Sequence, residues 1–236
     1  NLHAGHVACP GCGASLAMRY ALKALGTEAM FVIPACCWSI IAGPFPYSSL
    51  TTPLMHTPFE TAGAAASGIR ASLDQQGKED IAVVAWGGDG STFDIGLQAL
   101  SGAMERNEDF IYVCYDNEAY MNTGGQQSTA TLPGIKTTTT TEPGLTGMRK
   151  KNIVEIMAAH GIPLAASASI GYLPDLRRKI ELARSLKGFK FIHVHTPCPT
   201  GWRLDPKLAI KIGRLAVQTG AFPLYEIENG KLTINV

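Results

Sequence analysis

The feature that most constrains the fold is the stretch Trp86–Ser91 (WGGDGS), which separates two segments with different apolar patterns. Residues 81–85 before it form a short apolar run of strand length, and residues 92–104 after it carry apolar side chains at helical spacing. This order predicts a strand, a glycine turn and the start of a helix. Glycines let the backbone come close to a ligand, and the free N–H groups at a helix start attract anions such as phosphate.

A carboxylate in the same turn adds cation chemistry. Asp89 would repel a phosphate unless a cation lies between them, and Mg²⁺ is the usual cation because it prefers protein oxygens together with ligand phosphates. Residues 110–115 read as a second buried strand, which ends in the segment 116–119 (DNEA). Since parallel strands bring their carboxyl ends to one edge of a sheet, we expect Asp89, Asn117 and a backbone carbonyl near Ala119 to share one cation. The alternative is an ordinary Asp-Gly turn with an Asx turn at a strand end.

Strand and helix patterns alternate along the whole chain, which predicts an α/β fold with a mostly parallel, doubly wound sheet. We expect one domain over 1–236, with an N-terminal cysteine segment at about 1–13 and a C-terminal extension at about 203–236. The predicted helices are 14–25, 60–75, 92–104, 152–160, 173–186 and 206–220. The predicted strands are 30–33, 81–85, 110–115, 163–167 and 189–195, with a terminal hairpin of 224–227 and 231–236.

Two long segments lack periodicity. Residues 40 to about 58 are rich in Pro, Ser and Thr, and residues 117–149 contain the threonine run 137–141. Long loops inside compact domains are usually functional or disordered. We therefore expect the start of the second segment to form part of an active-site wall, and the threonine run to be a surface loop or a subunit contact.

Charge and hydropathy exclude two classes of partner. The net charge is +1, so no basic excess points to nucleic acid. No run of 18 apolar residues exists that would predict a membrane span. The first residues lack the pattern of a signal peptide, and we expect a cytoplasmic protein.

The six cysteines stand at positions 9, 12, 36, 37, 114 and 198. Cys9 and Cys12 form a CxxC pair, and Cys37 and Cys198 follow predicted strands whose ends could face it. Four thiolates suit a [4Fe–4S] cluster or a structural Zn²⁺; a redox CxxC pair normally follows a strand, and none is predicted before Cys9. Spacing alone does not decide between Cys36 and Cys37. Cys114 lies inside a strand and reads as a buried structural thiol.

Several motifs together resemble one protein family. Gly-Asp-Gly followed after 26 residues by Asn117 resembles the signature of thiamine diphosphate enzymes. With CPGC at 9–12, Cys37, YDNEAYMNTG at 115–124 and PCPTGW at 197–202, the chain resembles the β subunit of the 2-oxoacid:ferredoxin oxidoreductases, of which pyruvate:ferredoxin oxidoreductase is the best-known member. The resemblance covers nearly the whole chain.

The resemblance implies thiamine diphosphate, Mg²⁺ and one [4Fe–4S] cluster as cofactors. It assigns the cluster to Cys9, Cys12, Cys37 and Cys198, and gives Cys36 no ligand role because relatives commonly carry Gly there. It assigns Mg²⁺ to Asp89, Asn117 and the carbonyl of Ala119. Gly88, Gly90 and Ser91 would line the diphosphate, and Asn122 would be the catalytic side chain beside the reactive carbon of the thiazolium ring. The remaining cofactor-binding residues are Tyr120, Met121, Thr123 and Cys37.

The implied reaction is the oxidative decarboxylation of a 2-oxoacid with coenzyme A to an acyl-CoA and CO₂, with electrons passing through the cluster to ferredoxin. Pyruvate is the expected substrate; oxalate and branched-chain or aryl 2-oxoacids are alternatives, as is a non-redox thiamine enzyme subunit with a structural zinc. The family also implies partners: an α subunit that supplies the carboxylate activating the pyrimidine, and further γ- and δ-type subunits. We expect the chain to be active only with these partners.

Other polar residues receive plainer interpretations. Lys150 and Lys151 are expected at a solvated helix start, with a contact to coenzyme A as the alternative. Of His193 and His195, which alternate in a predicted strand, we expect only one to face the core.

Overall fold

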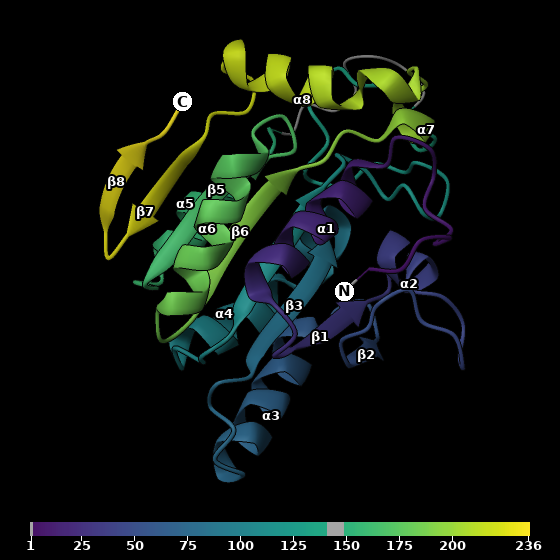
Figure 1. The fold of residues 1–236 in the computed structure, drawn as a ribbon. Helices are drawn as coiled ribbons and strands as arrows, with labels where there is room; N and C mark the ends of the chain where they lie inside the picture. The colour runs from purple at the N-terminus through teal and green to yellow at the C-terminus, as the bar shows by residue number, and fades with distance from the viewer. Residues whose placement is uncertain (1, 141–148) are drawn as a thin grey trace.

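The computed structural model describes residues 2–140 and 149–236, and these residues form an α/β structure around one eight-stranded sheet (Figure 1). The strand order is β2-β1-β3-β4-β6-β5-β7-β8, parallel from β2 to β5 and antiparallel at β7 and β8. The strands are β1 (Ala29–Pro34), β2 (Leu54–Thr57), β3 (Ala82–Gly88), β4 (Ile111–Asp116), β5 (Leu164–Ser169), β6 (Lys190–His195), β7 (Tyr225–Glu228) and β8 (Lys231–Ile234). The predicted fold class is confirmed.

Helices cover both faces of the sheet. The longer helices are α1 (Gly13–Leu25), α3 (Ala62–Gln75), α4 (Leu97–Glu105), α6 (Leu173–Ser185) and α8 (Ala209–Gln218), and the shorter ones are α2 (Cys37–Ile41), α5 (Ile153–Ala158) and α7 (Pro199–Trp202). Helices α1 and α6 lie side by side on one face, and α3, α4 and α5 contribute to the apolar cluster on the other (Figure 1). Central strands such as β4 are buried along their whole length, as expected for parallel strands covered on both faces. In the described part of the chain, no helix is long and apolar enough to cross a membrane.

The predicted helix ends follow from local signals that the structure confirms. Helix α1 stops at Gly26, whose φ of 75° is open to glycine at little cost. Asn152, predicted as the first residue of a helix, instead caps α5 by accepting from the backbone N–H of Glu155. Asp205 accepts from the N–H of Lys207, and Pro206 opens the 3₁₀ turn (Pro206–Leu208) that leads into α8.

Two boundary predictions are wrong. Strand β3 does not stop at residue 85 but continues to Gly88, and a π-helical turn (Gly90–Ile95) begins directly afterwards. Asp89 is therefore the single residue between β3 and the π-helical turn. The segment 40–58 is not all loop, because it contains the end of the short helix α2 and the parallel edge strand β2. Both elements are too short to show a clear period in the sequence.

In its described part, the threonine run lies at the surface as predicted, with Thr138 and Thr139 exposed. After β4, the described residues 117–140 contain no helix or strand, as predicted. The Thr138 N–H donates to the Gly125 carbonyl at 3.0 Å, and the Thr140 hydroxyl donates to Gln127 at 2.7 Å. The run thus packs back on residues 125–127; Thr141 lies outside the described residues.

Helix α8 crosses the sheet end by close backbone contact, which yields a prediction. A Cβ on Gly171 would lie 2.4 Å from the backbone N of Arg214. Gly171→Ala should therefore lower the free energy of unfolding in urea by about 1–3 kcal/mol, the usual cost of overpacking.

The matched control is Gly68→Ala on the exposed side of α3, where an added Cβ meets nothing within 4 Å. It should raise the free energy of unfolding by about 0.5–1 kcal/mol, the helix preference of Ala over Gly. Equal effects of the two substitutions would contradict the close contact.

Candidate functional site

Four motifs meet at one edge of the sheet because the strands that carry them are neighbours. The consecutive strands β1, β3, β4 and β6 end just before Ala35-Cys36, Asp89, Asn117 and Thr196-Pro197-Cys198. The register pairs Gly88 with Tyr115 and Asp116 with His195. The expected gathering of motifs at the carboxyl ends of the strands is confirmed.

A cavity of about 280 Å³ opens at this edge. Every residue predicted to bind the cofactor lines it: Cys37, Gly88, Asp89, Gly90, Ser91, Asn117, Ala119, Tyr120, Met121, Asn122 and Thr123. Five further lining residues carry no sequence signal that indicates a cofactor contact: Ala35, Cys36, Ser39, Phe59 and Tyr115. The lining combines a backbone turn that can approach an anion with an apolar wall.

The floor of the cavity requires glycine. A Cβ on Gly90 would lie 2.1 Å from the ring of Tyr120, which stands over this turn. The Tyr120 hydroxyl in turn donates to Asp94, and its ring lies 5.8 Å from that of Phe59. Tyr120 therefore closes one side of the cavity against the start of the π-helical turn.

Three oxygen-bearing groups converge beside this turn. One atom of the Asn117 side-chain amide lies 3.2 Å from Asp89 Oδ1 and 2.8 Å from the Ala119 carbonyl oxygen. With the amide oxygen at that place, three oxygens face one another; with the amide turned, its NH₂ donates to the other two. A set of facing oxygens is what a hard cation requires, so these residues could hold Mg²⁺ as predicted.

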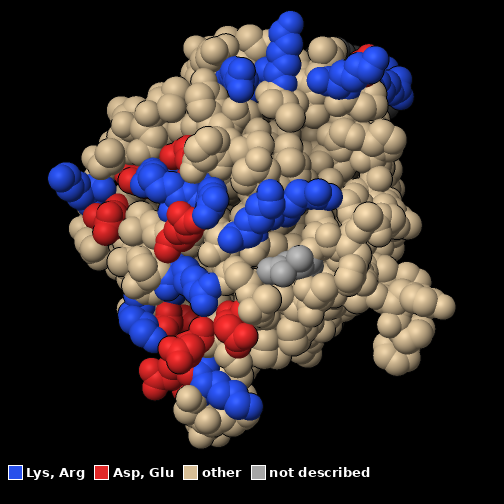
Figure 2. All heavy atoms as spheres, in the orientation of Figure 1, with Lys and Arg blue, Asp and Glu red and all other residues tan. Residues whose placement is uncertain are grey.

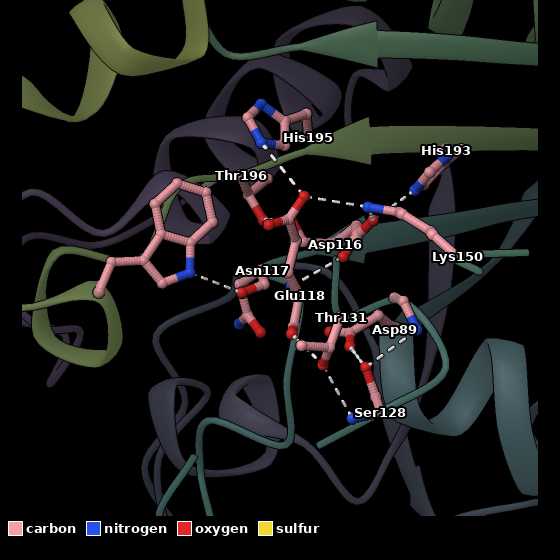
Figure 3. A network of polar contacts seen from close by, with 12 residues as sticks. Asp89, Asp116, Asn117, Glu118, Ser128, Thr131, Lys150, His193, His195 and Thr196 are labelled. Atoms are coloured by element: carbon pink, nitrogen blue, oxygen red, sulfur yellow. Dashed lines mark hydrogen bonds and ion pairs between the residues drawn. The ribbon is translucent and has the colours of Figure 1, made fainter. Parts of the chain in front are cut away.

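Asp89 is buried, with only 1% of its surface exposed. The Ser128 hydroxyl donates to its Oδ2 at 2.5 Å (Figure 3). Burial, and then the negative charge of Asp116, raise the pKa of the Asp89 carboxyl well above its usual value, although Ser128 and Lys150 act in the opposite direction. The carboxylate therefore lies in a place where a bound cation would be strongly favoured.

A buried ionic cluster lies directly behind Asn117 (Figure 3). Lys150 Nζ lies 2.6 Å from Asp116 Oδ2 and 3.1 Å from Glu118 Oε1, and His193 Nε2 lies 2.8 Å from Asp116 Oδ2. Burial alone would raise the pKa of Asp116, but Lys150 and His193 lower it below its ordinary value. Asp116 is thus an ionised carboxylate held between two nitrogens.

The structure corrects two interpretations here. Lys150 is not a solvated helix start, since its side chain is largely buried in this cluster and α5 begins only at Ile153. His193 and His195 are both buried, because residues two apart in a strand share a face. Burial lowers the pKa of His195 to about 3.

The cysteines gather at the same end of the sheet, close to helix N-termini. Cys12 precedes α1, Cys36 precedes α2, and Cys198 precedes α7 and accepts from the Gly201 N–H at 3.3 Å. Burial first, and then the charges of Cys36, Cys12 and Cys198, raise the pKa of the Cys37 thiol to about 12. After burial, Cys12 and Cys9 also contribute to the raised pKa of Cys198. The four predicted cluster ligands therefore influence one another, and Cys114 is buried in β4 as predicted.

Glycine contacts dock the N-terminal segment onto the chain after β6. A Cβ on Gly13 would lie 2.9 Å from the Pro197 carbonyl oxygen, and one on Gly11 would lie 2.5 Å from that of Pro206. Because Gly11 and Gly13 flank Cys12, and Pro197 precedes Cys198, these contacts place the CxxC segment beside the segment that contains Cys198. Within residues 2–140 and 149–236, however, no three His, Cys, Asp or Glu side chains stand close enough to hold a metal ion by themselves.

The sequence of this chain is similar to one family model and to proteins of known name. Residues 37–194 match the family model of the C-terminal thiamine pyrophosphate-binding domain of thiamine pyrophosphate enzymes. The chain is 54% identical to ketoisovalerate oxidoreductase subunit VorB of Pyrococcus abyssi, over 100% of this chain and 78% of the relative. It is 48% identical to pyruvate synthase subunit PorB of Methanothermobacter thermautotrophicus, over 98% of this chain and 81% of the relative.

A solved structure agrees with these relatives. The 2-oxoglutarate:ferredoxin oxidoreductase from Magnetococcus marinus, with 2-oxoglutarate, coenzyme A and succinyl-CoA bound, superposes with a TM-score of 0.72 and 25% identity. The match covers 90% of this chain and 78% of that one.

The burial of Asp89 gives a prediction for the metal-free chain. Its raised pKa means that folding favours the protonated carboxyl, so stability falls as the pH rises above the ordinary value of 3.8. Asp89→Asn removes that charge and should raise the free energy of unfolding of the EDTA-treated chain by about 1 kcal/mol or more at neutral pH. Urea titrations at several pH values measure this, and a variant less stable than the parent at neutral pH would contradict it.

Proposed function

This chain belongs to the β subunits of the 2-oxoacid:ferredoxin oxidoreductases, a family of oxidoreductases that use thiamine diphosphate, and we propose that it anchors that cofactor through Mg²⁺ beside a [4Fe–4S] cluster. The observation that carries the proposal is the convergence of Asp89, Asn117 and the Ala119 carbonyl at the glycine turn. A diphosphate at this turn would meet backbone N–H groups, and the facing oxygens would hold the cation beside it.

The lining residues fit the cofactor in their chemistry. The cavity extends from the glycine turn over Asn117 to the wall at Tyr120, Met121 and Asn122. When bound, thiamine diphosphate supplies the electron sink for the decarboxylation of a 2-oxoacid. Asn122 is exposed and lines the cavity, where its amide could donate to the substrate, which supports its proposed catalytic role.

The cysteine arrangement supports a cluster held by Cys9, Cys12, Cys37 and Cys198. An iron–sulfur cluster with four thiolates carries net negative charge, and helix N-termini at Cys12, Cys37 and Cys198 favour such charge. Cys36 lines the cavity, as Cys37 does, and lies beside Tyr115 and Gly88. We propose that the segment 1–13 serves the cluster, within one functional domain over 1–236 that ends in an extension over 203–236.

An exposed apolar surface next to the cavity supports a partner subunit. Phe45 is 98% and Tyr47 77% exposed in the loop after α2, and Ile40 and Met55 are also exposed. In Figure 2, the right side of the molecule carries almost no charged residue below the group of Lys and Arg side chains at the top right. Such a patch is typical of an interface. An α subunit docked there would cover the cavity and bring the carboxylate that activates the pyrimidine.

The proposed overall reaction joins a 2-oxoacid and coenzyme A to give an acyl-CoA and CO₂, and two electrons pass singly through the cluster to ferredoxin. Further γ- and δ-type subunits would complete the path, in the cytoplasm. Pyruvate is the substrate predicted from the sequence. The higher identity to a ketoisovalerate subunit than to a pyruvate synthase subunit favours a branched-chain 2-oxoacid as the second candidate.

Adjacent cysteines provide a direct test of the cluster. In the co-expressed complex, Cys37→Ser should remove the visible absorption of this cluster and its bleaching by dithionite, because a thiolate ligand is lost. Cys36→Ser is the matched control and should retain both. A complex that keeps its full iron content after the Cys37 substitution would disprove the ligand assignment.

A substrate panel tests the function itself. The purified native complex, assayed with viologen dye and coenzyme A, should reduce the dye with pyruvate or 2-ketoisovalerate but not when thiamine diphosphate is removed. The chain alone should be inactive with every 2-oxoacid. Turnover by the isolated chain would overturn the division of labour between subunits.

A further inference from the structure

The turn that presents Asn117 and Ala119 has an unusual backbone. Glu118 has a φ of 67°, in the left-handed region that non-glycine residues adopt at a cost. This conformation puts the Asn117 side chain and the Ala119 carbonyl on the same side, toward Asp89. A turn of this kind needs contacts that hold it in place.

The three carbonyl groups of the turn that point away from the cation site each accept a hydrogen bond. The Asp116 carbonyl accepts from the Thr196 N–H at 2.8 Å, and the Asn117 carbonyl accepts from the Trp202 indole at 3.0 Å. The Glu118 carbonyl accepts from the Thr131 hydroxyl at 2.6 Å. The peptide groups are therefore fixed by three separate elements.

Lys150 holds the two side chains that flank Asn117. Its ammonium contacts Asp116 at 2.6 Å and Glu118 at 3.1 Å (Figure 3). The other oxygen of Asp116 accepts from the Glu118 N–H at 2.8 Å, which closes the turn on itself. One ammonium thus links both ends of the left-handed turn, with Asn117 between them.

We propose that Lys150 is a positioning residue for the cation site: it holds the segment 116–119 in the conformation that delivers the Asn117 side chain and the Ala119 carbonyl to Mg²⁺. The inference rests on the proposed function. Lys150 does not touch the cavity, and it acts through Asp116 and Glu118. Lys150 lies more than 30 residues after the turn in the chain, so the contact between its ammonium and the two carboxylates is a tertiary contact.

The test measures cation affinity, with Mn²⁺ as the probe. The complete complex is depleted of metal, saturated with thiamine diphosphate, and titrated with Mn²⁺ while free Mn²⁺ is followed by electron paramagnetic resonance. Lys150→Met should weaken Mn²⁺ binding about 10- to 100-fold, the usual cost of losing a residue that orients metal ligands. Lys150→Arg should restore part of the loss, since a guanidinium can still bridge two carboxylates.

The matched control is Lys190→Met. Lys190 is also a buried lysine in an ion pair, 2.5 Å from Asp109, but it lies at the opposite end of the sheet. Its loss should destabilise the fold in a comparable way and leave Mn²⁺ binding within about twofold of the parent.

A double variant separates positioning from charge balance. Lys150→Met with Asp116→Asn removes the buried charge that Lys150 neutralises, and so keeps the fold testable if the single variant does not fold. The double variant should still bind Mn²⁺ about 10-fold or more weakly, because the link to Glu118 is gone. Parental affinity in either Lys150→Met variant would overturn the positioning role alone. A parental complex without Mn²⁺ affinity would overturn the proposed function as well.

Discussion

The site depends on the parallel pairing of β3 with β4. The register that pairs Gly88 with Tyr115 puts Asp89 one residue beyond β3 and Asn117 one residue beyond β4. A shift by one residue would turn the side chains to the other face of the sheet and separate the facing oxygens. Because β1 and β6 flank this pair, the cysteines after them come to the same edge. One pairing therefore positions both proposed cofactor sites.

This arrangement accumulates buried charge, and the fold compensates the carboxylates to different degrees. Lys150 pairs with both Asp116 and Glu118, and His193 Nε2 lies 2.8 Å from Asp116. His195 adds no charge, since burial lowers its pKa to about 3, and its Nδ1 has no hydrogen-bond partner among the described residues. Asp89 is matched less well, since its direct partners are the Ser128 hydroxyl and the Asn117 amide. Such an incompletely compensated carboxylate is what a cation-binding site requires, and it opposes the stability of the empty chain.

Several elements could be predicted from local sequence. Residues 86–91 specify a strand end and a helix start, and the glycine caps and the Asp205-Pro206 start specify helix boundaries. The cofactor-binding residues proposed from the resemblance all line one cavity, whereas their individual roles stay predictions. The short elements α2, β2 and α7 were missed, because four or five residues carry no readable period.

By itself, the sequence determined the alternation of strands and helices, the glycine turn at Asp89 and the placing of reactive side chains at strand ends. Those features are local: they follow from apolar spacing and from backbone preferences of Gly, Pro and Asn. Only the tertiary structure decided that Lys150 is buried behind Asn117, that Ser128 donates to Asp89, and that both His193 and His195 face the core. Those contacts join residues separated by long stretches of chain, and a lysine or serine has no local signal that distinguishes a solvated side chain from one that pairs with a distant buried carboxylate.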